Sequence, residues 1–130
     1  MIVVDTSALV AILQHEPSAP ACQKILEHES RVLISAGTFV EAMIVSRRRG
    51  FASTMEQFLH ASISEIVPVT AERALLVAEA NAMWGKSIHP AGLNFGDCFA
   101  YATAKEFGCP LLYIGNDFSR TDVVSAIARV

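Results

Sequence analysis

MIVVDTSALV, residues 1–10, contains the pattern that decides the fold. Three apolar residues, Ile2, Val3 and Val4, precede Asp5, two hydroxyl residues and a second apolar run. This order predicts a short buried strand, a polar turn and the start of a helix. Ligands of parallel α/β sheets bind beyond the carboxyl ends of the strands, so we expect Asp5 where such a protein keeps its chemistry.

The rest of the chain alternates short apolar runs with longer helical segments. Further strands are expected at residues 32–35, 66–69 and 111–114, and helices at 8–13, 19–28, 37–49, 51–63, 71–84 and 97–107. Pro68 indicates an edge position or a strand start for the third strand. Strands that alternate with helices of this length indicate an α/β fold with a parallel sheet covered on both faces. The last eight residues carry no clear pattern.

Composition narrows the class of protein. A chain of 130 residues with 52% hydrophobic and 18% charged residues predicts a single domain, residues 1–130, with a full core and an oligomer interface. The net charge of −3 excludes a general electrostatic attraction for nucleic acid. No basic region precedes the first apolar stretch and no long uncharged run follows, so we expect a cytoplasmic protein without a membrane span.

Four acidic residues differ from the surface acids in their positions: Asp5, Glu41, Asp97 and Asp117. Each also has an ordinary structural role available. Asp5 can cap a helix, and Glu41 can face solvent. Asp97 can be a favourable charge at a helix start, and Asp117 can be a turn residue. Asp5 and Asp117 follow the first and last predicted strands, so they lie close together if those strands are neighbours. Taken together, the four positions predict carboxylates that converge at the carboxyl edge of one sheet.

Converging carboxylates need a partner, because moving an ionised carboxylate out of water costs several kcal/mol unless it is paired. A hard divalent cation, Mg²⁺ or Mn²⁺, takes oxygen ligands and keeps waters for exchange with substrate. Such a site suits phosphodiester hydrolysis. Asp5 is then expected to be the first metal ligand, with Thr6 and Ser7 free to cap the helix that follows.

Several motifs together resemble the PIN-domain nucleases across the whole chain. They are VDTSAL at residues 4–9, a glutamate on the third helix, Gly96-Asp97 at the start of a helix of small residues, and NDF at residues 116–118. The longer motifs IHPAGLNFGDC, residues 88–98, and GNDFSRTD, residues 115–122, are similar to those of the VapC-type toxins of prokaryotic toxin–antitoxin pairs.

The resemblance implies a three-layer α/β/α sandwich with a central, mainly parallel sheet of four to five strands. It implies an Mg²⁺- or Mn²⁺-dependent endoribonuclease that forms a homodimer, takes RNA as its substrate and is neutralised by a VapB-type antitoxin. The implied acidic site consists of Asp5, Glu41, Asp97 and Asp117, with Thr6, Ser7 and Asn116 as polar support.

The last acidic position departs from the family pattern. Many PIN domains carry a threonine or serine two residues before the last aspartate, whereas Gly115 precedes Asp117 here. Many also carry a phenylalanine three residues after that aspartate, whereas Phe118 follows Asp117 directly. Asp122 is therefore an alternative fourth ligand that shares or takes the role of Asp117.

The basic residues form two small groups. Arg47, Arg48 and Arg49 stand at the expected end of a helix, where a solvated cluster is favoured by the helix dipole and contact with RNA phosphates is the alternative. Lys86 and His89 lie in the long segment that leads to Asp97, where they can guide a substrate.

Two other functions compete with the nuclease hypothesis. An aspartate-based phosphoryl-transfer enzyme also places aspartates at strand ends, but position 7 is serine where such a phosphatase needs a second aspartate. A receiver domain needs a paired acid before Asp5, and position 4 is valine. The non-enzymatic alternative is a PIN-like binding module with a vestigial metal site.

Overall fold

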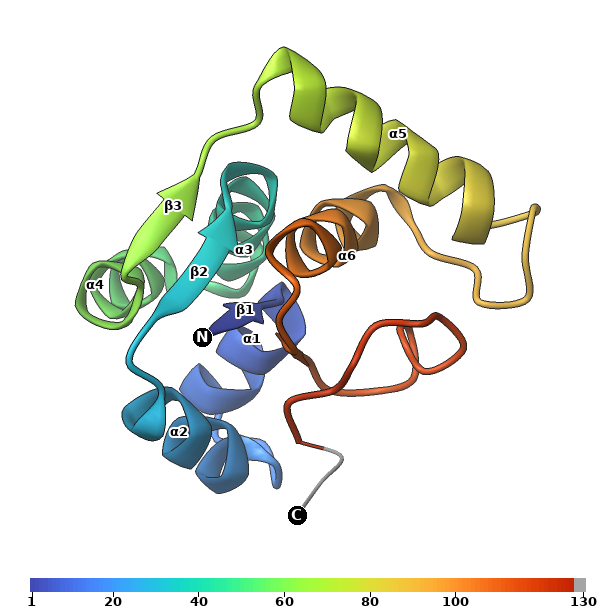
Figure 1. The fold of residues 1–130 in the computed structure, drawn as a ribbon. Helices are drawn as coiled ribbons and strands as arrows, with labels where there is room; N and C mark the ends of the chain where they lie inside the picture. The colour runs from blue at the N-terminus through green and yellow to red at the C-terminus, as the bar shows by residue number, and fades with distance from the viewer. Residues whose placement is uncertain (128–130) are drawn as a thin grey trace.

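A computed structural model describes residues 1–127 (Figure 1). Its strands are β1 (Ile2–Val4), β2 (Val32–Ser35), β3 (Glu65–Val67) and β4 (Leu111–Leu112), and its helices are α1 (Thr6–Leu13), α2 (Ala19–His28), α3 (Ala36–Arg49), α4 (Ala52–Ser62), α5 (Ala71–Trp84) and α6 (Phe95–Phe107). Within that range, no helix has the length and apolar character that crossing a membrane requires.

The four strands form one parallel sheet in the order β3-β2-β1-β4. Val3 pairs with Leu33 on one side and with Leu111 on the other, so β1 lies in the centre of the sheet. The strand predicted at residues 66–69 is observed at Glu65–Val67, so Pro68 follows it instead of lying within it. Its predicted edge position is confirmed.

Alternating side chains of the strands build two cores. Ile2, Val4 and Ile34 pack in a cluster with α1, α2, α3 and α4, whereas Val3 and Leu33 pack with α5 and α6 on the opposite face. The layers are therefore helices, sheet and helices, as predicted. Figure 1 shows α5 and α6 side by side, with α2 far from both of them.

The ends of several elements differ from the prediction, and at two helix starts a polar side chain is the reason. The sixth helix begins at Phe95 rather than at residue 97, since Asn94 caps it. The first helix begins at Thr6 rather than at residue 8, since Asp5 caps it. The last strand stops at Leu112, two residues early. Of the last eight residues, Ser125 bridges to Leu111, and residues 128–130 lie outside the described part.

The parallel arrangement brings three helix starts to one edge. The helices α1 and α3 leave from the carboxyl ends of β1 and β2, and α6 runs back to the amino end of β4. The N-termini of α1, α3 and α6 therefore meet at the carboxyl edge of the sheet. Helix N-termini carry partial positive charge, which favours acidic groups there.

We predict that Leu33→Ala lowers the free energy of unfolding by about 3 kcal/mol, because it leaves a cavity in the central sheet. Leu33 is fully buried, whereas Leu75 on α5 is 69% exposed. The matched variant Leu75→Ala should change the free energy by less than about 0.5 kcal/mol. Urea denaturation measures both, and equal losses would contradict this placement of the core.

Candidate active site

Asp5 follows β1 directly and is buried, with 4% of its surface exposed. Its Oδ2 atom accepts hydrogen bonds from the Ser7 backbone N–H at 3.0 Å and from the Ser7 hydroxyl at 2.7 Å. Its Oδ1 atom is buried without a hydrogen-bond partner. The expectation that Thr6 and Ser7 cap α1 in place of Asp5 is wrong, because Asp5 caps the helix with one oxygen and keeps the other one unpaired.

Ser7 joins Asp5 to a distant part of the chain. Its hydroxyl oxygen accepts a hydrogen bond from the backbone N–H of Ile114 at 3.0 Å while the hydroxyl donates to Asp5. The backbone N–H of Asp5 itself donates to the Leu112 carbonyl at 2.9 Å. The turn after β1 is thus fixed to the segment that follows β4.

Glu41 lies on the second turn of α3 and is half-buried. Side chains of a helix lean toward its N-terminus, so this carboxylate reaches back to the carboxyl edge of the sheet. Its Oε1 atom accepts a hydrogen bond from the Thr6 hydroxyl at 2.7 Å. A residue on α1 therefore holds an acid that comes from α3.

Asp97 sits on the first turn of α6, buried with 6% of its surface exposed. Its Oδ2 atom accepts from the Asn94 backbone N–H at 3.0 Å, and its own backbone N–H donates to Asn94 Oδ1 at 2.8 Å. This reciprocal capping box fixes the side chain at the start of the helix. The spacing of Asn94 and Asp97 along the chain matches that motif, so this signal for the cap was present in the sequence.

Burial raises the pKa of both aspartates. For Asp5, desolvation outweighs the lowering effect of its hydrogen bonds with Ser7, and the negative charge of Glu41 adds to the increase, so that the pKa rises from 3.8 to about 6. For Asp97, desolvation raises the pKa to about 7. Three neighbouring carboxylates contribute to this second increase: Asp5, Asp117 and Glu41. The charges of the other three acids therefore all act on the carboxyl group of Asp97.

The two alternatives for the last acid occupy different surroundings. Asp117 is exposed on the turn after β4, and its charge acts on Asp97. Asp122 accepts a hydrogen bond from the Tyr101 hydroxyl and pairs with Lys105 Nζ at 3.2 Å. The Tyr101 hydrogen bond holds the pKa of Asp122 below its usual value. Asp122 is thus directed to the middle of α6.

The four carboxylates interact electrostatically, but their positions do not form a complete metal-binding site. Among residues 1–127, no three His, Cys, Asp or Glu side chains are arranged closely enough to hold a metal ion. Two observations still fit a divalent cation in this region. The buried Oδ1 of Asp5 lacks a partner, and carboxylate oxygens are the donors that Mg²⁺ and Mn²⁺ prefer.

The PIN-domain family model matches residues 2–124 of this chain. The chain belongs to the PIN-domain family. Ribonuclease VapC30 of Mycobacterium tuberculosis is 39% identical to this PIN domain over 126 residues, which is 95% of this chain and 96% of the relative. Ribonuclease VapC of Mycolicibacterium smegmatis is also 39% identical, covering 95% and 98%. Both resemblances found in the sequence, to PIN domains and to VapC-type proteins, are confirmed.

Solved structures support the PIN fold. The crystal structure of Mycobacterium tuberculosis VapC20, a sarcin-ricin loop cleaving toxin, has a TM-score of 0.76 at 20% identity and covers 98% of this chain and 99% of its own. A toxin–antitoxin complex from Klebsiella pneumoniae has a TM-score of 0.74 at 17% identity and covers both chains fully, at 100%. At these identities the likeness concerns the fold alone.

The predicted basic residues of this PIN domain make no described hydrogen bond or ion pair with the four acids. Helical rise places Arg47 about 9 Å beyond Glu41 along α3. Arg49 donates to Gln14 Oε1 at 2.6 Å at the far end of α1. Lys86 is exposed on the loop after α5. None of these residues joins the carboxylates.

The loop that leads to Asp97 and the turn that carries Asn116 are held by local contacts. The ring of His89 packs edge-on against Trp84, and its Nδ1 accepts from the Ala91 backbone N–H at 3.0 Å. The Asn116 carbonyl accepts from the backbone N–H and the hydroxyl of Ser119 at 3.2 and 2.8 Å. His89 therefore shapes its loop rather than the acidic site.

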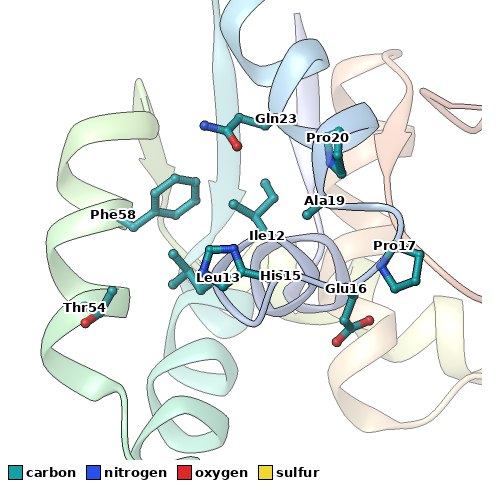
Figure 2. Close-up of a pocket in the computed structure, with 10 residues that line it drawn as sticks. All are labelled: Ile12, Leu13, His15, Glu16, Pro17, Ala19, Pro20, Gln23, Thr54 and Phe58. Carbon is teal, nitrogen blue, oxygen red and sulfur yellow. The ribbon is translucent and has the colours of Figure 1, made fainter.

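A pocket of about 740 Å³ lies elsewhere on the PIN domain, between the end of α1, the start of α2 and α4 (Figure 2). Figure 2 shows Phe58 of α4 pointing toward Ile12 and Leu13 of α1. None of the predicted acidic residues lines this pocket. The volume of this pocket therefore does not point to the acids, whereas the burial of Asp5 and Asp97 and the charges around them do.

We predict that the metal-free protein loses stability as the pH rises from about 5 to 8. The folded pKa values of Asp5 and Asp97 exceed the ordinary value of 3.8, so the folded state binds protons that the unfolded chain has already released. Asp97→Asn should flatten this fall and raise the melting temperature at pH about 8. Calorimetry in chelator measures both effects.

The matched control is Asp122→Asn, because the pKa of Asp122 is lowered rather than raised. This variant should retain the wild-type fall in stability between pH about 5 and 8. A difference between wild type and Asp97→Asn that does not change with pH would contradict the electrostatic assignment.

Proposed function

We propose that this PIN domain is a metal-dependent endoribonuclease that acts as the toxin of a VapBC-type toxin–antitoxin pair. The observation that carries the proposal is the buried, unpaired Oδ1 of Asp5, beside a second buried acid, Asp97, whose pKa is raised by desolvation and also by the charges of its neighbours. A single folded unit over residues 1–130 and a cytoplasmic location are part of the same proposal. The VapC ribonuclease names of the relatives support the reaction class.

Mg²⁺ or Mn²⁺ would be held by Asp5 and Asp97, with Glu41 and Asp117 completing the acidic site. When bound, such a cation supplies Lewis-acid activation of water and of the phosphate group. The choice of Asp117 over Asp122 rests on their surroundings, since Asp122 is engaged by Tyr101 and Lys105 and Asp117 is exposed beside Asp97.

Other residues of this chain would orient the acids. Ser7 binds Oδ2 of Asp5 and leaves Oδ1 as the atom for the cation. Thr6 orients Glu41, whose half-exposed carboxylate can accept a proton from an attacking water. The main-chain carbonyl of Asn116 supports the turn that carries Asp117. These contacts come from three separate parts of the chain.

Exposed basic residues would contact the RNA outside the acidic site. Arg47, Arg48, Arg49 and Lys86 are exposed, and we assign them to phosphate contacts at a distance from the bond that is cleaved. Large exposed apolar side chains such as Phe95 at 78% and Ile88 at 58% support a homodimer and binding of a VapB-type antitoxin.

We predict that Asp97→Asn lowers the rate of RNA cleavage by more than about 100-fold, beyond the loss typical of residues that only orient a metal ligand. The matched control Asp122→Asn should cleave within about threefold of wild type, because it leaves the acidic site intact. Purified proteins are compared on RNA with Mg²⁺ or Mn²⁺, and chelator should stop the wild-type reaction.

Growth after induced expression is the second measurement. Wild type should slow growth, and the slowing should be absent with Asp97→Asn. Cleavage by Asp97→Asn at the wild-type rate, or wild-type cleavage in chelator, would overturn the assignment of the site. Harmless expression of an active wild-type protein would overturn only the toxin role.

A further inference from the structure

The carboxylate of Glu41 lies directly against the backbone of Gly96. A Cβ atom built on Gly96 would overlap Glu41 Oε2 and would stand 2.7 Å from Glu41 Cδ, closer than real Cβ atoms approach their neighbours. The three atoms nearest to that Cβ position all belong to the Glu41 carboxylate. The space that a side chain would fill at residue 96 is therefore occupied by an acid from another helix.

Thr6 holds the same carboxylate from another side. The hydroxyl of Thr6, the first residue of α1, donates to Glu41 Oε1 at 2.7 Å while Oε2 rests on Gly96, the second residue of α6. The acid thus sits in a slot between the N-termini of α1 and α6. We call this the Thr6–Gly96 slot.

Backbone conformation does not explain the glycine. The glycines with positive φ are Gly50, Gly92, Gly108 and Gly115, and Gly96 is not among them. Within a helix, glycine is less favourable than alanine, because it loses more conformational freedom on folding. An alanine at residue 96 would therefore be better for the helix alone, and the close approach of Glu41 is the feature that requires glycine.

We propose that Gly96 is a positioning residue whose missing side chain admits the Glu41 carboxylate to the acidic site beside Asp97. This proposal rests on the proposed function, in which Glu41 helps to hold a divalent cation. The slot sets which way the carboxylate faces, since one oxygen is bound by Thr6 and the other is confined by the Gly96 backbone.

The variant Gly96→Ala should fold. The overlapping atoms are the far end of a flexible, half-exposed side chain, so Glu41 can swing toward solvent at small cost to stability. That movement breaks its hydrogen bond with Thr6 and takes the carboxylate out of the site. The fold is retained and the position of the acid is lost.

The experiment measures Mn²⁺ binding by titration calorimetry, together with the thermal midpoint of the metal-free protein. Gly96→Ala should weaken Mn²⁺ binding roughly 10- to 100-fold, the loss typical of residues that orient a ligand. Its thermal midpoint should not fall. In a Glu41→Ala background, Gly96→Ala should cause no further loss of affinity, because the group that it displaces is already gone.

Gly37→Ala is the matched control. Gly37 is the second residue of α3, and a Cβ there would stand 2.7 Å from Cε1 of Phe99 rather than against an acid. This variant should lower the thermal midpoint and keep the wild-type affinity for Mn²⁺. An equal loss of affinity in both glycine variants would overturn the specific role of Gly96.

A metal-free readout separates this proposal from the proposed function. The carbon-13 shift of the Glu41 carboxyl group should move in Gly96→Ala toward that of the exposed Glu72, and Thr6→Val should move it in the same direction. Unchanged Mn²⁺ binding and an unchanged Glu41 shift in Gly96→Ala would overturn the slot. If Gly96→Ala shows the shift change but the wild-type protein binds no Mn²⁺, the proposed function is overturned and the slot is not.

Discussion

The buried carboxylate of Asp5 at the end of the central strand is the constraint on which the rest of the site depends. Half of that carboxylate is satisfied by Ser7, and the other half is buried without a partner. A polar group in this condition costs stability unless something binds it. The fold keeps Asp5 there and adds a second desolvated acid, Asp97, to the same edge of the sheet. Under the proposed function, this arrangement would favour binding of a cation over stability of the metal-free protein.

Parallel topology explains how acids far apart in the chain become neighbours. Strands that run the same way place their carboxyl ends together, and the helices that connect them begin or end at the same edge. The positive ends of α1, α3 and α6 offset part of the repulsion between the acids. Single hydrogen bonds then set the details, from Ser7 to Asp5 and from Thr6 to Glu41.

Most elements of the fold could be predicted from the sequence, because apolar periodicity and turn residues are local signals. The errors lie at element ends, where one side chain decides whether a helix begins, as Asn94 and Asp5 do. The choice between Asp117 and Asp122 could not be made in the same way. Both follow the last strand within a few residues, and only contacts with Tyr101 and Lys105 distinguish them.

The sequence by itself determined the α/β class, the order of the elements and the family, and it singled out four candidate acids, since each depends on residue types and spacings along the chain. Tertiary structure decided which oxygen of Asp5 is unpaired, that Asp122 is bound by Tyr101 and Lys105, and that Glu41 rests on Gly96. The physical reason is that desolvation and close packing depend on atoms from several elements at once. The sequence shows that residue 96 is a glycine, but only the fold shows that the carboxylate of Glu41 occupies the space of the missing side chain.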